Sequence, residues 1–183
     1  MATEQMLIGL YSPAAQSGKS TVAGILRANH GFKTKSFATA LKRMVADLLY
    51  STGFSPEDVG RIMDVDKEAP IPELGDRSFR QLAQTLGTEW GRYLVDKDIW
   101  VKVLMNAPER PNLLVIDDVR FENEYEAIKA DGGQVWRITR PGVEIATAHI
   151  SEGALDGFEF DEEIINDGSY DDLEAKVKTA LLG

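Results

Sequence analysis

Residues 6–21 read MLIGLYSPAAQSGKST, and this stretch decides the fold. An apolar pattern typical of a buried strand covers 6–11, a loop follows, and a helical pattern begins near Lys19. Backbone N–H groups in such a loop and in the first turn of its helix can surround phosphate oxygens. The lysine then reaches the terminal phosphates, and the hydroxyl of Ser20 ligates Mg²⁺. The stretch therefore predicts a nucleotide-binding loop that uses Ser17, Gly18, Lys19, Ser20 and Thr21.

The loop departs from the usual pattern G-x-x-x-x-G-K-[ST] at one position, where Pro13 replaces the first glycine. Proline fixes φ near −65° and has no N–H, whereas glycine leaves φ unrestricted. We therefore expect the first turn of the loop to be built differently from the usual one. The alternative is that Gly18 and Lys19 only begin a helix and bind no ligand.

The composition limits the possible partners of this chain. Its 183 residues carry a net charge of −10, and no Lys/Arg-rich run provides a surface for the phosphates of polymeric nucleic acid. There is no cysteine, and we find neither a signal peptide nor an apolar stretch long enough to span a membrane. We predict a cytoplasmic protein with no membrane partner, and leave its oligomeric state open, with a homodimer among the options.

Strand and helix patterns alternate along the chain, which predicts an α/β fold with a parallel sheet and helices on both faces. The expected strands cover 6–11, 32–37, 113–116, 134–139 and 164–165. The expected helices cover about 19–29, 41–49, 55–63, 77–94, 98–107, 122–130 and 170–182. We predict one domain, 1–183, with a core of 1–37 and 108–183 and a helical insertion of about 38–107.

Two acids follow the apolar run that ends at residue 116. Ligands bind at the carboxyl ends of parallel strands, so Asp117 and Asp118 are expected in the same cleft as Lys19. Side chains alternate along a strand, so only one of the two acids is expected to face the cleft, and the sequence does not decide which. We assign Asp117 to the metal with Ser20, and Asp118 to catalysis. The alternative is that both acids are turn formers.

Several arginines could contact phosphate groups. Arg120 could reach a transferring phosphoryl group, or form a surface ion pair with Glu124. Arg137 and Arg140 flank the end of the strand pattern at 134–139, and the irregular segment of about 140–160 is a candidate lid, or else an ordinary long loop. One edge of the helix expected at 77–94 carries further polar residues, which form either a ligand site or a solvated face: Arg77, Arg80, Gln84, Thr88 and Arg92.

Seven short blocks, spread in order over nearly the whole chain, carry a resemblance. They are FAxxLKxM at 37–44, RxLxQxLGTExxR at 80–92, DxW at 98–100, DVRFxNE at 118–124, RPG at 140–142, HxSE at 149–152 and NDG at 166–168. Together they resemble the deoxynucleoside monophosphate kinases of tailed bacteriophages. The resemblance implies a three-layer P-loop kinase fold, a monophosphate-binding helical insertion and an arginine-bearing lid. It also implies transfer of a phosphoryl group from ATP to a dNMP with Mg²⁺, in the host cytoplasm if the chain is phage-encoded.

The resemblance implies roles for individual residues. The catalytic candidates are Lys19, Asp118, Arg120 and Arg140. The ATP candidates beyond the loop are Arg137, Asn166, Asp167 and Gly168, with the last three at the adenine unless they only form a turn. The candidates for dNMP binding are Lys42, Arg80, Gln84, Glu89, Trp90, Arg92 and Trp100.

Three other functions remain open from the sequence. One is a different small-molecule kinase, similar to dephospho-coenzyme A kinase, which shares the short phosphate loop and the Asn-containing turn before the last helix. The second is a nucleotide-binding protein without transfer activity, which the unusual Pro13 keeps open. The third is an ATPase that acts on polymers, which the acidic composition disfavours. The base and sugar preference of a kinase is also left open.

Overall fold

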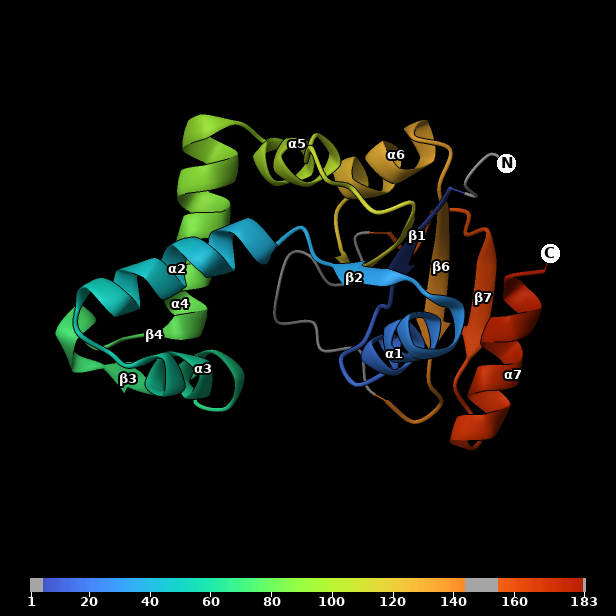
Figure 1. The fold of residues 1–183 in the computed structure, drawn as a ribbon, viewed down its shortest axis with the longest axis horizontal. Coiled ribbons are helices and arrows are strands. Elements are labelled where there is room, and N and C mark those ends of the chain that lie inside the picture. The colour runs from blue at the N-terminus through green and yellow to red at the C-terminus, as the bar shows by residue number, and fades with distance from the viewer. Residues whose placement is uncertain (1–4, 144–154, 183) are drawn as a thin grey trace. The chain divides into compact units, whose positions relative to one another are not determined.

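The computed structural model describes residues 5–143 and 155–182. The chain forms two compact units. We call them the sheet unit, residues 1–37 and 105–183, and the helical unit, residues 38–104 (Figure 1).

The sheet unit is built on five parallel strands in the order β2-β5-β1-β6-β7. Their bounds are Met6–Tyr11 (β1), Lys33–Lys35 (β2), Leu113–Val119 (β5), Gln134–Thr139 (β6) and Glu162–Ile165 (β7). The central strand β1 is buried from Leu7 to Tyr11, because helices cover both faces of a parallel sheet. The predicted α/β fold class with a parallel sheet is therefore confirmed.

Helices lie on both faces of this sheet. Helices α1 (Lys19–His30) and α7 (Tyr170–Ala180) share one core with Ile8 and Leu10 of β1. Gly9 points to the opposite face, where a Cβ atom would lie 2.5 Å from Ile128 of α6 (Glu122–Ala130). Glycine at this position therefore allows α6 to pack closely on the sheet.

The helical unit contains three α-helices before its π-helical segment and, after it, a fourth helix whose last residue belongs to the sheet unit. Their bounds are Thr39–Ser51 (α2), Pro56–Asp64 (α3), Phe79–Gln84 (α4) and Ile99–Met105 (α5). A short antiparallel pair, β3 (Pro70–Ile71) and β4 (Arg77–Ser78), flanks the 3-10 turn η1 (Pro72–Leu74). The start of α3 is as expected, since the Ser55 side chain accepts a hydrogen bond from the Asp58 N–H.

The helix expected at 77–94 differs in the structure. It is replaced by β4, then α4, then the π-helix η2 (Thr85–Val95). The indole N–H of Trp100 donates to the carbonyl of Gly87 at 2.8 Å, and a Cβ on Gly91 would lie 2.6 Å from the Trp100 ring. These contacts come from the next helix along the chain, so the local sequence pattern does not reveal them.

Two other expectations also differ. The second strand is shorter than the expected 32–37, because the chain turns toward Asp118 after Lys35. The expected elements leave 64–76 without a helix or strand, whereas the structure has β3 and η1 in this segment. Within residues 5–143 and 155–182, no helix combines the length and apolar character needed to cross a membrane.

Candidate active site

The loop between β1 and α1 begins with a turn closed by a side chain. The Ser12 hydroxyl accepts a hydrogen bond from the Ala14 N–H at 3.2 Å and donates to the Ala14 carbonyl at 2.9 Å. A serine turn therefore forms where Pro13 has no N–H to offer. Two residues then adopt left-handed backbone conformations, Gln16 at φ 59° and Gly18 at φ 106°. Gly18 is the N-cap of α1, which places Lys19 at the first helical position.

The end of this loop is fastened to the turn that follows β7. The side-chain amide of Asn166 donates to the carbonyl of Ser17 at 3.0 Å, and its backbone N–H donates to the carbonyl of Thr139 at 2.7 Å. A Cβ on Gly18 would lie 2.4 Å from the Asn166 amide nitrogen. Glycine is thus required at position 18 both by its backbone conformation and by this close approach.

Lys19 lies near two acids and an arginine. Burial and, to a smaller extent, the nearby Arg120 lower the pKa of Lys19, while Asp118 and Asp117 raise it, and the net result is a pKa of about 8. Both acids lie close enough to Lys19 to favour its charged form, and that only one of them faces the cleft stays a prediction. The pairing of β5 with β1 shifts register beside these acids, which breaks simple alternation.

The carboxylate of Asp118 is held by the chain that follows β2. One of its oxygens accepts a hydrogen bond from the Phe37 N–H at 2.8 Å, and the other accepts one from the Ser36 hydroxyl. These bonds fix the orientation of the carboxylate. Sequence reasoning missed Ser36, although its position at the end of an expected strand was the available signal.

The predicted alternative for Arg120 was a surface ion pair with Glu124. Glu124 is only 2% exposed, so it does not lie on a solvated surface. Its carboxylate accepts hydrogen bonds from the backbone N–H groups of Arg120 at 2.8 Å and Phe121 at 3.1 Å. Glu124 therefore caps the start of α6 and fixes the backbone from which the Arg120 side chain extends.

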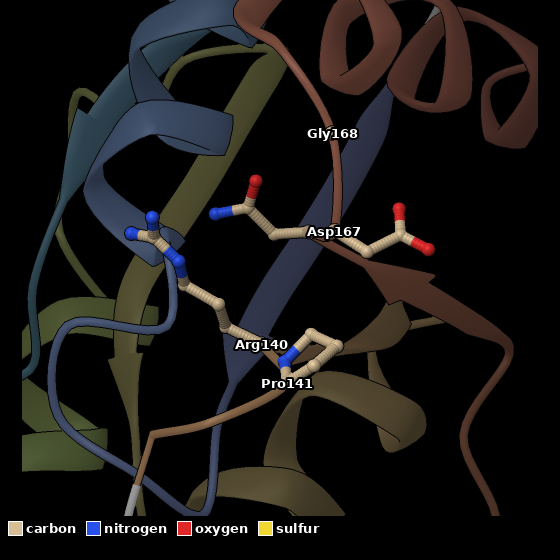
Figure 2. Close-up of a pocket in the computed structure, with 5 residues that line it drawn as sticks. Arg140, Pro141, Asp167 and Gly168 are labelled. Atoms are coloured by element: carbon tan, nitrogen blue, oxygen red, sulfur yellow. The ribbon is translucent and has the colours of Figure 1, made fainter.

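A pocket of about 230 Å³ lies in the sheet unit. It is lined by Arg140, Pro141, Asn166, Asp167 and Gly168. Figure 2 shows the Arg140 guanidinium extending from the end of β6, while the Asp167 carboxylate points away from Arg140. That carboxylate pairs with Lys176 at 2.5 Å, and Lys176 lowers its pKa. Asp167 thus fastens the turn to α7, whereas Arg140 lines the pocket.

The candidates in the helical unit lie on α2, α4 and η2. Lys42, Gln84 and Glu89 are exposed. Arg80 forms an ion pair with Glu68, and the guanidinium of Arg92 donates to the carbonyl of Lys97 at 3.3 Å.

The two candidate tryptophans differ in exposure. Trp100 is 3% exposed, whereas Trp90 is 39% exposed, and their ring centroids lie 6.4 Å apart. Trp90 is therefore the more accessible of the two rings, and the buried Trp100 packs beside it.

Comparison with known proteins places the chain in a family. The model of the family described as deoxynucleotide monophosphate kinase matches residues 50–177. This chain belongs to the deoxynucleotide monophosphate kinase family. It is 30% identical to a putative deoxynucleotide monophosphate kinase of Acanthamoeba polyphaga mimivirus, over 94% of both chains. It is 33% and 35% identical to the deoxynucleotide monophosphate kinases of Enterobacteria phage T4 and Escherichia phage RB69, over 57% of this chain and 45% of each relative.

Membership of this family confirms the predicted fold, enzyme class and family-level function. The chain matches about half the length of the T4 and RB69 proteins and nearly all of the mimivirus protein. The predicted roles of individual residues stay predictions. So does the division of this kinase into core, monophosphate-binding insertion and lid.

The structure of this kinase brings some predicted residues together. Lys19, Asp117, Asp118 and Arg120 form one electrostatic cluster, and Arg140 lines a pocket with Asn166. Ser20 and Thr21 are exposed in the first turn of α1. The HxSE block and most of the expected lid, residues 144–154, lie outside the described residues.

Arg137 occupies a different environment from the other candidates. Its guanidinium lies 3.6 Å from Asp156 and 3.7 Å from Glu163, and stands over the Phe160 ring at 5.6 Å. The Tyr11 hydroxyl donates to the same Asp156 at 2.8 Å. Arg137 therefore ties β6 to β7 and to the segment before it, and an ATP contact would come in addition to these bonds.

Proposed function

We propose that this kinase transfers the γ-phosphoryl group of ATP to a deoxynucleoside monophosphate and releases ADP and a deoxynucleoside diphosphate. A phosphate oxygen of the acceptor forms the new bond to phosphorus, and the bond to the bridging oxygen of ADP breaks. The observation that carries the proposal is the placement of Lys19 at the start of α1, beside Arg120, Asp117 and Asp118. The substrates are dissolved deoxynucleotides, so we place the activity in the cytoplasm.

Phosphoryl transfer depends on positioning and on neutralising charge, and no covalent protein intermediate is needed. In the proposed mechanism, the N–H groups of the loop and the first turn of α1 hold the β- and γ-phosphates. Lys19 and Arg120 balance the negative charge that spreads over the transferring group. Arg140 reaches the donor from the pocket side, in agreement with its position there.

A magnesium ion fits the groups present around Lys19. Mg²⁺ takes oxygen ligands, commonly one or two carboxylates with substrate phosphates and water. Ser20 in the first turn of α1 and Asp117 at the end of β5 supply oxygen atoms of this kind. When bound, the ion neutralises phosphate charge. Asp118 is held by Ser36 and Phe37, so we assign it the role of orienting the cluster around Lys19.

We assign the acceptor to the helical unit. Arg80 and Arg92 are proposed to bind its phosphate, because a guanidinium grips phosphate with two hydrogen bonds. Lys42, Gln84, Glu89 and Trp90 are proposed to contact the base and sugar, with Trp100 supporting Trp90.

The test is ADP formation from ATP and Mg²⁺ with each common dNMP and NMP in turn, with every product identified by mass. We expect transfer to one or several dNMPs. Arg80→Ala should raise the KM for the dNMP at least tenfold while leaving the KM for ATP within about twofold, because it removes a phosphate-binding charge. Equal effects on both KM values would remove Arg80 from the acceptor site. Phosphorylation of dephospho-coenzyme A alone, or no product at all from folded protein, would refute the proposed reaction.

A further inference from the structure

Asn166 makes three contacts that join distant parts of the sheet unit. Its side-chain amide binds the Ser17 carbonyl, its backbone N–H binds the Thr139 carbonyl, and its amide nitrogen closely approaches Gly18. Ser17 and Asn166 are 149 positions apart in the sequence. The turn after β7 therefore contacts the loop that the proposed function assigns to phosphate binding.

The bond to Ser17 controls which way a neighbouring N–H group points. The peptide group between Ser17 and Gly18 is planar and trans, so its C=O and N–H point in opposite directions. Because Asn166 holds the carbonyl on its own side, the Gly18 N–H is directed to the other side. Backbone N–H groups in such loops are the donors to phosphate oxygens.

The Ser17 side chain does not replace this restraint. Ser17 is 1% exposed, and its hydroxyl oxygen finds no hydrogen-bond partner among the residues that the structure describes. The Ser17–Gly18 peptide is thus oriented through its carbonyl by the Asn166 amide. Gly18, the next residue, has the left-handed backbone conformation that glycine adopts readily.

We propose that Asn166 is a positioning residue for the phosphate-binding loop. It acts on the polyphosphate of any donor through Ser17 and Gly18, and does not select adenine. This proposal rests on the proposed function, because it takes residues 12–20 as the site of the donor phosphates. It differs from the role expected for the Asn-Asp-Gly turn, since an amide that donates to Ser17 is already engaged on the loop side.

The test compares a donor that has a base with one that has none. Dissociation constants for ATP and for inorganic tripolyphosphate are measured by calorimetry on the full chain, with Asn166→Ala and Asn166→Leu. The leucine variant has a similar shape, adds no charge and cannot donate to Ser17, so it provides the readout should the alanine variant fail to fold. We expect both ligands to bind about tenfold more weakly in each variant that folds, with the ratio of the two constants unchanged.

Asn29→Ala is the matched control. Asn29 on α1 also donates a side-chain amide bond to a distant residue, Glu174 of α7 at 2.5 Å, but on the surface and away from the loop. Both dissociation constants should stay within about twofold of the wild type in this variant.

Three outcomes would overturn the inference. Weaker binding of ATP alone would mean that Asn166 reads adenine, and unchanged binding of both ligands would mean that it has no positioning role. A wild-type chain that binds neither ligand would remove the phosphate loop itself and the proposed function with it. Weaker binding of both ligands, in a chain that transfers phosphate to no dNMP, would support the inference while refuting the proposed function.

Discussion

Replacing Lys19 with methionine should make this kinase more stable and at the same time inactive. Lys19 has its pKa lowered from 10.5 to about 8, mainly because burial disfavours the charged form. This pKa difference means that the charged form of Lys19 costs about 3 kcal/mol more in the folded chain than in the unfolded chain. Methionine keeps much of the aliphatic stem and removes the charge. Because Lys19 retains some exposure, we expect a gain of about 2 kcal/mol at pH 7.

The stability difference between Lys19→Met and the wild type should depend on pH, in a direction that follows from the lowered pKa of Lys19. Below pH 8 Lys19 is charged in both the folded and the unfolded chain, so its full energetic penalty is present in the native state. As the pH rises from about 8 toward 10.5, the folded chain loses this proton first and the penalty disappears. The stability advantage of Lys19→Met should therefore be complete at pH 7, smaller at pH 9.5, and absent near pH 10.5.

The assay is urea unfolding without nucleotide, at pH 7 and pH 9.5, for the wild type and Lys19→Met. Lys178→Met is the matched control, since Lys178 is exposed on α7 and its replacement should change the free energy of unfolding by less than about 0.5 kcal/mol. Turnover of Lys19→Met should fall by several orders of magnitude. The reasoning is refuted if Lys19→Met is no more stable than the wild type at pH 7, or if its advantage does not shrink at pH 9.5.

Three further predictions concern the pH dependence of ATP binding and two helical glycines. Bound phosphate favours charged Lys19, so ATP affinity should fall above pH 8 by up to tenfold per pH unit; constant affinity from pH 7 to 9.5 in calorimetry would contradict this. Gly91→Ala should lower the free energy of unfolding by about 1–3 kcal/mol, because its Cβ would meet the Trp100 ring at 2.6 Å. A Cβ on Gly24 of α1 would meet nothing within 4 Å, so Gly24→Ala should instead raise the free energy of unfolding by up to about 1 kcal/mol. Thermal melts in which Gly91→Ala is more stable than Gly24→Ala would contradict the packing of Gly91 against Trp100.

Local sequence patterns predict the sheet unit well. Strand β1 and helix α1 lie where the apolar run and the Gly-Lys-Ser sequence place them, at Met6–Tyr11 and Lys19–His30. Both elements are specified by residues that are close together in the chain. The apolar run before Asp117 likewise predicts β5, although the strand continues through both acids to Val119.

Contacts between residues that are far apart in the chain could not be predicted from the sequence. The π-helix η2 packs against Trp100, which belongs to the following helix. The orientation of Asp118 depends on Ser36, 82 positions earlier. The hydrogen bond from Asn166 to Ser17 joins residues 149 positions apart. An asparagine at position 166 predicts a turn, but it does not predict which residue the side chain binds. Such contacts appear only when the arrangement of the elements within each unit is known.

The helical unit is one uninterrupted stretch, Ala38–Leu104, which leaves the sheet after β2 and returns before β5. These two strands pair directly with each other, so the sheet itself anchors both ends of the stretch. All residues proposed for the acceptor lie inside it, and all those proposed for ATP lie outside. On the proposed assignments, acceptor preference and donor chemistry are encoded in separable pieces of the gene. A single in-frame exchange of codons 38–104 could transplant the choice of nucleotide from one kinase to another without rewriting the strand pairing that supports phosphoryl transfer.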